Sequence, residues 1–354
     1  MTAPVFVNCR FLTQRLTGVQ RFAVEICRQI RRLDRSVEFL APEEALRADT
    51  DRNFDLTIVG KSAGHLWEQF DLPRFLKKHG YPMLLNLGNL APAYYLRNVV
   101  TIHDLALFHN PLWFSLAYRT YHRWVISRTV RRAKKVLTVS NFSKQEMKKF
   151  LSVPESCITV IPNAVGENIL RLAGRSFANE YGRYVLAVFS MDPRKNLNRL
   201  IQAFSQLKLK DTKLILVGAR NRIFAESGLP QTFQNADNII FKEYLPEVKL
   251  VALYQHALCL VYPSLYEGFG LPPLEAMACG CAVVTSNVSS LPEACGDAAY
   301  YVNPHDVNSI AEGMYKVTTN DHLRKGLIEK GLKRATLFNW KSSAQQLLNV
   351  LGSL

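Results

Sequence analysis

Two glutamates and a glycine loop in the C-terminal half of the chain form its most informative segment. Leu258 to Tyr262 is an apolar run that predicts a buried strand, and a loop with two glycines, Glu267 to Gly270, follows it. A proline pair, a short helix from Leu274 to Cys279 and a second apolar run from Ala282 to Thr285 come next. Open α/β sheets bind ligands at such carboxyl ends of parallel strands.

The loop and its flanking carboxylates suit a ligand that carries both phosphate and hydroxyl groups. Glycines leave backbone N–H groups uncovered, and a helix start adds free N–H groups and the positive end of its dipole. Glu267 precedes the loop and Glu275 is expected inside the first helical turn, and carboxylates accept hydrogen bonds from sugar hydroxyls. The alternative is an ordinary strand-to-helix turn in which Glu275 only stabilises the helix dipole.

Two adjacent cations follow another predicted strand. Tyr184 to Phe189 is an apolar run, and Arg194 and Lys195 stand at the turn between it and an amphipathic helix. Such a pair can neutralise a diphosphate, the arginine through its forked guanidinium and the lysine as a point charge. The alternative is an exposed surface pair, but the position at a strand end favours a functional role.

The N-terminal half offers two further candidates. Val99 to His103 predicts a strand that ends at His103, with Asp104 beside it as a group that orients the imidazole. A histidine at a strand end is more often structural, but the adjacent carboxylate and the strand-end position favour function here. Thr17 fits a capping box at the start of a helix, where Gly18 either lets a ligand approach closely or only shapes the turn.

The stretch from Glu267 to Glu275, EGFGLPPLE, resembles the E-x7-E signature of glycosyltransferase family 4, retaining enzymes of the GT-B fold. The PRKN segment at Arg194 and Lys195 matches the family too, and the resemblance spans nearly the whole chain. It implies an α/β protein of two Rossmann-like domains that face each other across a cleft, with the C-terminal helix crossing back to the first domain.

The resemblance also implies how the domains divide the work. We expect an N-terminal, acceptor-side domain at residues 1–165 plus 340–354, and a C-terminal domain that binds a nucleotide-sugar donor at residues 166–339. The polar stretch from Gly166 to Arg183 is expected to link them.

Individual residues receive roles from the same resemblance. Glu275 would bind the ribose hydroxyls, and Glu267 would bind the sugar or stabilise its oxocarbenium-like charge. Arg194 and Lys195 would neutralise the leaving diphosphate. His103 would contact the donor sugar or the acceptor, and it completes the catalytic candidates. Further donor contacts are expected from Gly18, Tyr244, Leu245, Gly268, Phe269, Gly270 and Leu271.

The charge of the chain is basic and uneven. Its 44 basic and 29 acidic residues give a net charge of +15, and residues 1–165, with 24 basic and 13 acidic residues, carry +11 of it. Segment 119–135 holds seven cations and no acidic residue, interleaved with aromatic side chains. Such a helix suits an anionic membrane surface, or it is a packed helix with a solvated basic face. Nucleic-acid binding is least favoured, because no recognised binding motif accompanies the charge.

Cysteine usage and hydropathy indicate the compartment. Seven cysteines, an odd number placed mainly in apolar stretches, are typical of a reduced cytosolic protein. The start of the chain lacks a signal-peptide pattern, and no run reaches the roughly 18 apolar residues of a membrane span. We therefore expect a cytoplasmic protein, peripheral on the inner face of the cell membrane if it binds there. No ligand spacing typical of a metal is visible, so we expect no metal and no cofactor besides the donor substrate.

Together with the resemblance, these features predict a retaining, metal-independent hexosyltransferase. It would move a hexose, of the mannose or rhamnose type, from a GDP-, dTDP- or UDP-linked donor to a glycan or polyprenyl-linked saccharide in surface polysaccharide synthesis. Two other classes stay open. One is a GT-B relative such as a nucleotide-sugar epimerase or a phosphorylase, and the other is a non-catalytic protein that binds a membrane or nucleic acid through the basic segment.

Overall fold

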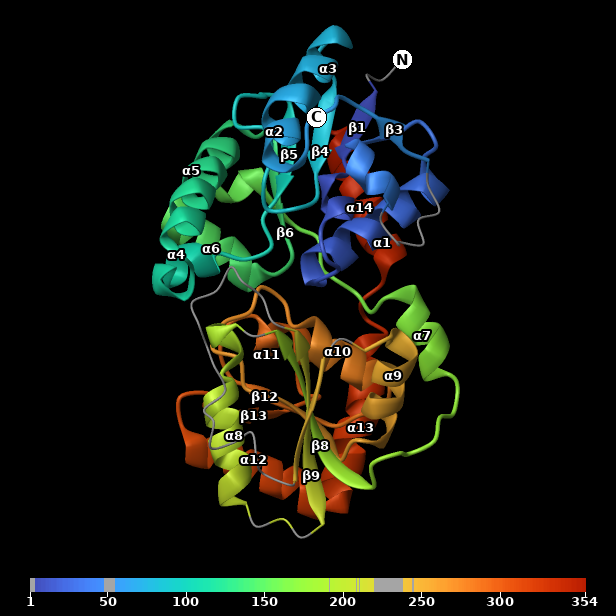
Figure 1. The fold of residues 1–354 in the computed structure, drawn as a ribbon, viewed down its shortest axis with the longest axis vertical. Coiled ribbons are helices and arrows are strands. Elements are labelled where there is room, and N and C mark those ends of the chain that lie inside the picture. Colours follow the sequence, from blue (N-terminus) through green and yellow to red (C-terminus); the bar gives the residue numbers. More distant parts are fainter. Residues whose placement is uncertain are drawn as a thin grey trace. The chain divides into compact units, whose positions relative to one another are not determined.

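The computed structural model describes residues 4–47, 55–190, 192–207, 209, 211–219, 238–243 and 245–354. The chain divides into two compact units (Figure 1). Unit 1 comprises Met1–His109, Ala117–Asn163 and Asn339–Leu354, and unit 2 comprises Asn110–Leu116 and Ala164–Phe338. The predicted domain boundaries, 165/166 and 339/340, stay predictions.

Unit 1 is built on a parallel sheet whose described strands follow the order β3-β2-β1-β4-β5-β6-β7. From β1 the chain moves outwards to β2 and β3, and it then returns to β4 on the other side of β1. The strand order therefore reverses between β1 and β4, and ligands bind at such a switch point in open α/β sheets. The strands are β1 (Val5–Asn8), β2 (Glu38–Ala41), β3 (Thr57–Ile58), β4 (Met83–Asn86), β5 (Asn98–Thr101), β6 (Lys135–Thr138) and β7 (Ile158–Val160).

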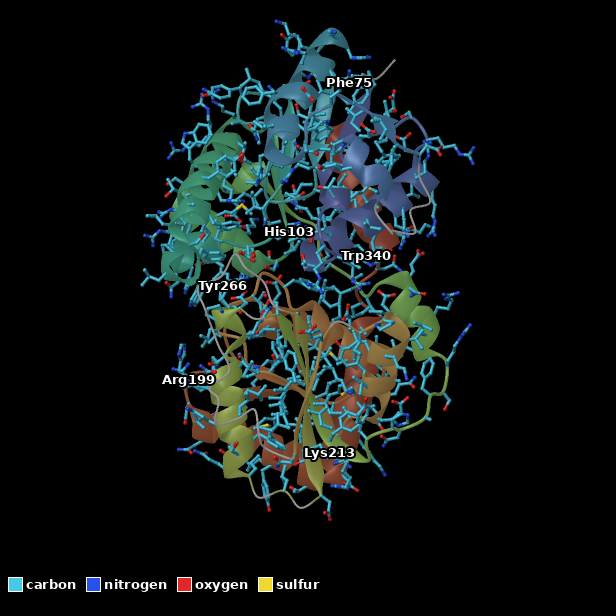
Figure 2. All side chains as sticks on the ribbon, viewed as in Figure 1. Phe75, His103, Arg199, Lys213, Tyr266 and Trp340 are labelled. Carbon is cyan, nitrogen blue, oxygen red and sulfur yellow. The ribbon has the colours of Figure 1, made fainter. Side chains whose placement is uncertain are left out.

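Helices cover both faces of this sheet. Helix α1 begins with the predicted capping box, in which Thr17 N donates to Gln20 Oε1 at 3.2 Å. The last helix, α14, returns to unit 1 and packs beside α1 (Figure 1). It carries Trp340 (labelled in Figure 2), whose ring lies 5.8 Å from that of Phe22 on α1. The helices of this unit are α1 (Gly18–Leu33), α2 (Gly64–Leu66), α3 (Leu72–Lys78), α4 (Ala106–His109), α5 (Leu116–Arg132), α6 (Asn141–Leu151) and α14 (Trp340–Gly352).

Unit 2 repeats the architecture with a parallel sheet in the order β10-β9-β8-β11-β12-β13, as far as the described residues show. Its strand order reverses between β8 and β11. Figure 1 shows α8 and α12 on one face and α9, α10 and α13 on the other. The strands are β8 (Arg183–Ser190), β9 (Thr212–Ala219), β10 (Ile239–Lys242), β11 (Cys259–Tyr262), β12 (Val283–Ser286) and β13 (Tyr300–Val302). The helices are α7 (Glu167–Ala173), α8 (Leu197–Gln206), α9 (Glu247–His256), α10 (Leu271–Ala278), α11 (Leu291–Cys295), α12 (Val307–Thr319) and α13 (Asp321–Ala335).

The two parallel sheets confirm the predicted fold class, but three local expectations were wrong. Strand β5 ends at Thr101, so His103 lies in the loop after it. The expected linker, 166–183, contains α7, which packs on α9 through a hydrogen bond from Asn168 to Glu247. Helix α10 begins at Leu271 rather than Leu274. Among the described helices, none combines the length and apolar character needed to cross a membrane.

Candidate functional site

The loops after β8 and β11 meet at the switch point of unit 2. Leu265 N donates to the carbonyl of Arg194 at 2.7 Å. Asn196 Nδ2 donates to the carbonyl of Pro263 at 3.0 Å. The structure thus brings together the predicted cation pair and the predicted glycine loop, which lie more than 70 residues apart in the chain.

Lys195, Glu267 and Tyr262 form a hydrogen-bonded triangle between these two loops. Lys195 Nζ lies 2.5 Å from Glu267 Oε1 and donates to the Tyr262 hydroxyl at 2.7 Å. That hydroxyl donates to Glu267 Oε1 at 2.8 Å. Burial disfavours the charge of Lys195, but the Glu267 carboxylate outweighs it, so the pKa of Lys195 lies above its usual value. Burial and then the charge of Glu267 raise the pKa of Tyr262, so its hydroxyl stays protonated.

Arg194 is held by a neighbouring carboxylate. The guanidinium contacts Asp192 Oδ2 through Nε at 2.8 Å and through a terminal nitrogen at 2.6 Å. Its carbon atom Cζ lies 5.7 Å from the centre of the Phe114 ring. Asp192 is buried and also accepts from the Arg194 backbone N–H at 2.9 Å. Each of the two cations is therefore pre-oriented by a carboxylate, which lowers the entropy cost of presenting it to an anionic ligand.

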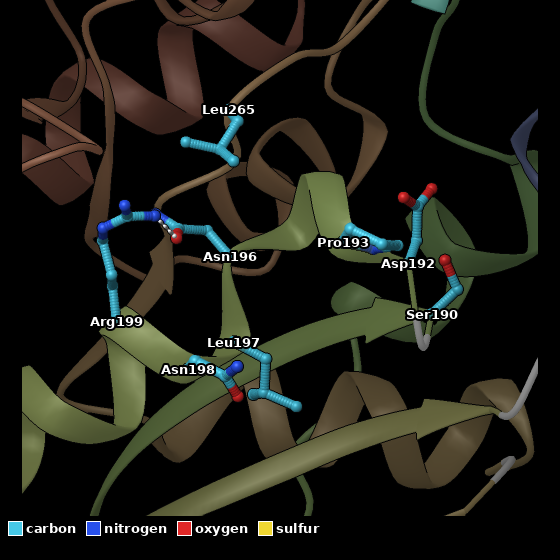
Figure 3. Close-up of a pocket in the computed structure, with 8 residues that line it drawn as sticks. All are labelled: Ser190, Asp192, Pro193, Asn196, Leu197, Asn198, Arg199 and Leu265. Atoms are coloured by element: carbon cyan, nitrogen blue, oxygen red, sulfur yellow. Dashed lines mark hydrogen bonds between the residues drawn. The ribbon is translucent and has the colours of Figure 1, made fainter. Parts of the chain in front are cut away.

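Asn196 fixes the turn that carries both cations. Its backbone is left-handed, with φ of 60°, and the buried Nδ2 also donates to the carbonyl of Pro304 at 2.6 Å. Asn196 Oδ1 accepts from Arg199 at 3.0 Å (Figure 3). This turn lines an open pocket of about 150 Å³. The lining residues are Ser190, Asp192, Pro193, Asn196, Leu197, Asn198, Arg199 and Leu265.

Substitution of Asn196 should separate its two contributions to this turn. Asn196→Gly keeps a residue that adopts a left-handed backbone at no cost but removes the hydrogen bonds, and we expect a loss of about 2 kcal/mol in the free energy of unfolding. Asn196→Ala should lose about 1 kcal/mol more, because alanine disfavours that backbone. Urea denaturation measures both, with the exposed Asn198→Ala as control. Equal losses for glycine and alanine would contradict the backbone contribution.

The loop after β11 is rigid and tightly packed. Gly270 has φ of 108°, and a Cβ atom there would lie 2.8 Å from a methyl group of Leu291. Glu267 N donates to Ser289 Oγ at 3.1 Å, and Ser290 Oγ donates to the Glu267 carbonyl at 2.9 Å. Only glycine fits at position 270 without displacing α11 or straining the backbone. The loop therefore holds Gly268 and the buried Phe269 in place at the start of α10.

Glu275 lies deeper in α10 than predicted. Because the helix begins at Leu271, Glu275 is its fifth residue and stands beyond the first turn. The effect of the helix dipole falls off within the first turn. Glu275 therefore lies too far along α10 to serve only by stabilising that dipole. The side chain is only 6% exposed, and the Tyr254 hydroxyl donates to its Oε2 at 3.3 Å. A buried carboxylate at this edge of the sheet is costly for the fold and fits a ligand-binding role.

The unit 1 candidates lie at the carboxyl edge of its sheet. His103 is buried, and its Nε2 lies 2.9 Å from the carbonyl of Leu87, so Nε2 carries the proton and Nδ1 is an acceptor. Burial lowers the pKa of His103, which keeps the imidazole neutral. The ring is thus oriented by Leu87, while Asp104 Oδ1 accepts from the Ala106 backbone at 3.0 Å. Gly18 is the first residue of α1.

Other site residues are placed as follows. Leu271 opens α10 and Leu245 lies between β10 and α9, while Tyr244 lies outside the described residues.

Sequence reasoning missed Asp192 and Tyr262. Asp192 carried a signal, since an aspartate before proline is a common helix cap, whereas nothing marked Tyr262 beyond its strand end. In the described part of the chain, no group of three or more His, Cys, Asp or Glu side chains could hold a metal ion.

Family models match both halves of the chain. Residues 172–334 match the model described as Glycosyl transferases group 1, and residues 16–168 match Glycosyltransferase Family 4. The chain is 34% identical over 268 residues to O-antigen chain mannosyltransferase B of Escherichia coli, covering 72% of this chain and 69% of the relative. It is 32% identical over 228 residues to the serotype-specific mannosyltransferase WbdA of Escherichia coli, covering 60% of this chain but only 28% of that relative.

Solved structures share the fold over the whole chain. Sucrose-phosphate synthase from Thermosynechococcus elongatus has a TM-score of 0.77 at 20% identity, covering 99% of this chain and 98% of that one. Anabaena Alr3699/HepE in complex with UDP has a TM-score of 0.74 at 15% identity, covering 100% of both. With the family models on both halves and a relative matched over two thirds of its length, this chain belongs to glycosyltransferase family 4 and has the GT-B fold.

Proposed function

We propose that this protein is a retaining transferase of mannose, from a nucleotide-diphosphate donor to a saccharide acceptor in surface polysaccharide synthesis. The observation that carries the proposal is the cluster at the unit 2 switch point, where Lys195 and Glu267 are paired beside the glycine loop. The names of the relatives, O-antigen mannosyltransferases, support mannose over the other hexoses.

Each donor-site residue has a chemical task in this proposal. Arg194 and Lys195 stabilise the negative charge that grows on the leaving diphosphate as its bond to the anomeric carbon breaks. Glu267 stabilises the oxocarbenium-like positive charge that develops on the sugar ring in the transition state. Glu275 accepts hydrogen bonds from the ribose hydroxyls. The acceptor oxygen bonds to the same face of the anomeric carbon, and the leaving phosphate takes its proton. Backbone contacts come from Gly268, Phe269, Gly270, Leu271 and Leu245.

Two unit 1 residues complete the proposed machinery. The neutral His103 presents Nδ1 as an acceptor for a hydroxyl of the donor sugar or the acceptor. Gly18 has no side chain at the start of α1, which suits a close approach of an anionic ligand to the N–H groups of that helix.

The experiment that tests the proposal combines binding with product analysis. Thermal shifts are measured with GDP, UDP, dTDP and ADP, and mass spectrometry follows mannose transfer from the matching nucleotide sugar to p-nitrophenyl α-mannobioside. We expect one selective shift, an acceptor-dependent mannosyl product and unchanged turnover with EDTA. A sugar product that forms without acceptor would instead indicate an epimerase. Absence of any nucleotide shift and any product would overturn the proposal.

We further propose that segment 119–135 attaches the enzyme to an anionic membrane surface, where a polyprenyl-linked acceptor would lie. Trp124 is 49% exposed, and Arg131 and Arg132, about two turns later on the same side of α5, are also exposed. An exposed tryptophan with cations beside it fits an interface between lipid and water.

Neutralising this face should weaken vesicle binding. Arg131→Gln with Arg132→Gln removes about 2 kcal/mol of attraction, which is about 30-fold in affinity for phosphatidylglycerol vesicles. Sedimentation at low and high salt measures it, with phosphatidylcholine vesicles as the lipid control. The matched variant is Arg32→Gln with Arg35→Gln, two exposed residues in the last turn of α1 and just after it. Equal binding by both double variants would remove this surface from the proposal.

A further inference from the structure

A polar cluster occupies the switch point of unit 1, the position that corresponds to the donor site of unit 2. Asn8 ends β1 and Asn86 ends β4, the two strands between which the strand order reverses. Asn8 Nδ2 donates to Asn86 Oδ1 at 3.0 Å and to Glu68 Oε1 at 2.9 Å. In unit 2 the residues after the equivalent strands include Lys195 and Glu267. Both switch points thus carry a polar network at the edge where open sheets bind ligands.

Glu68 is the centre of this cluster. It is 2% exposed and belongs to a π-helical turn, Trp67–Asp71, which the buried Trp67 anchors by donating to the Val59 carbonyl at 2.6 Å. Arg10 Nε lies 3.1 Å from Glu68 Oε1. Burial opposes the charge of Glu68, but the charge of Arg10 and the hydrogen bond from Asn8 favour it, so the pKa of Glu68 is lowered and the group stays ionised. Single π-helical turns are rare in proteins, but those that occur are often found at functional sites.

Three buried polar atoms of the cluster lack a hydrogen-bond partner among the described residues. They are Glu68 Oε2, the Tyr121 hydroxyl and Arg10 Nε, whose contact with Glu68 Oε1 is an ion pair. His65 Nδ1 lies 3.8 Å from Glu68 Oε2, too far for a hydrogen bond. Each such buried atom costs about 1–3 kcal/mol. A purely structural network would pair them, so their state points to a ligand that supplies the missing partners.

Aromatic rings stand beside these atoms. The ring of His65 lies 4.9 Å from that of Tyr121 and 5.8 Å from that of His122, and His122 stacks on Tyr118 at 3.7 Å. His65 is 44% exposed, and Leu66 next to it is 63% exposed, so the cluster reaches the surface on this side. Flat rings beside hydrogen-bonding groups match a sugar ring, which has apolar faces and a rim of hydroxyls.

We infer that Glu68, Tyr121 and His65 form a binding site for a saccharide, the acceptor of the transfer reaction. Glu68 Oε2 accepts from one sugar hydroxyl, and the Tyr121 hydroxyl donates to another oxygen. The buried atoms left without partners are hydrogen-bonding groups, among them an acceptor on Glu68 and a hydroxyl on Tyr121, and such groups suit the hydroxyls of a sugar. The role as acceptor site rests on the proposed function, whereas saccharide binding itself does not.

Tyr121→Phe is the sharpest test, because the hydroxyl it removes has no partner in the fold. The melting temperature should not fall, the KM for p-nitrophenyl α-mannobioside should rise about tenfold, and the donor KM should stay unchanged. Glu68→Gln should also raise the acceptor KM, although loss of the contact with Arg10 also affects its stability. The matched control is Tyr94→Phe, an exposed tyrosine of the same unit, which should leave every value unchanged.

The outcomes separate this inference from the proposed function. Transfer with an unchanged acceptor KM in both Tyr121→Phe and Glu68→Gln would overturn the inference and leave the function intact. If the wild-type protein shows no transfer, saturation-transfer NMR with methyl α-mannoside decides. Saccharide binding that Tyr121→Phe abolishes would support the site without the reaction. No saccharide binding by the wild-type protein would overturn the site.

Discussion

Lys195→Met should lower kcat by at least about 100-fold at saturating donor and acceptor. The ammonium group stabilises charge that grows on the diphosphate only as the sugar leaves, so its loss affects the transition state more than the bound donor. The raised pKa of Lys195 keeps it charged at neutral pH. The same substitution leaves Glu267 as a largely buried carboxylate without its cation, which should cost about 3 kcal/mol of stability. Initial rates and urea denaturation measure the two effects.

Two variants separate catalysis from stability at this position. Lys195→Met with Glu267→Gln removes both charges and should recover most of the stability but none of the turnover. Lys249→Met breaks an exposed pair with Glu180 and should change neither turnover nor stability by a measurable amount. Wild-type turnover in Lys195→Met would remove the proposed role of this residue.

Glu275→Gln should weaken nucleotide-diphosphate binding by about 100-fold. The carboxylate can accept from two ribose hydroxyls, whereas the amide offers one acceptor and places N–H donors against the other hydroxyl. Hydrogen bonds to a charged group account for the expected loss of about 3 kcal/mol. Isothermal titration with the nucleotide selected by the wild-type protein measures the affinity.

Two controls accompany this result: the melting temperature of Glu275→Gln and the affinity of a variant with a substituted surface glutamate. Glu275→Gln keeps the shape of the buried side chain and an acceptor for the Tyr254 hydroxyl, so its melting temperature should stay near that of the wild type. Glu312→Gln removes an exposed charge on α12 and should leave the affinity unchanged. Equal affinities in Glu275→Gln and the wild-type protein would assign the ribose contact elsewhere.

Much of the fold can be predicted from the sequence because buried parallel strands have continuous apolar runs. β1 and β4 begin where such runs begin, and Thr17 marks the start of α1 through its cap. The start of α10 was misplaced because proline is compatible with the first helical turn and does not by itself fix which residue is first. Segment 166–183 reads as polar, yet its few apolar residues, such as Ile169, suffice to pack α7.

The partners of the site residues could not be predicted, because they depend on strand order rather than on local pattern. The sequence places Lys195 and Glu267 at strand ends, but only the adjacency of β8 and β11 puts them 2.5 Å apart. Glu68 carries no local signal at all, since its burial arises from a π-helical turn that propensities do not indicate. The roles of these residues remain predictions that the experiments above test.

The most direct test of the central claim is the anomeric configuration of the product. NMR follows the wild-type enzyme with ¹³C-mannose-labelled nucleotide donor and p-nitrophenyl α-mannobioside. A retaining mechanism predicts a new mannosyl linkage with the anomeric configuration of the donor, formed together with free nucleotide diphosphate. A linkage of inverted configuration, or release of nucleotide diphosphate with no transfer of the sugar, would contradict it.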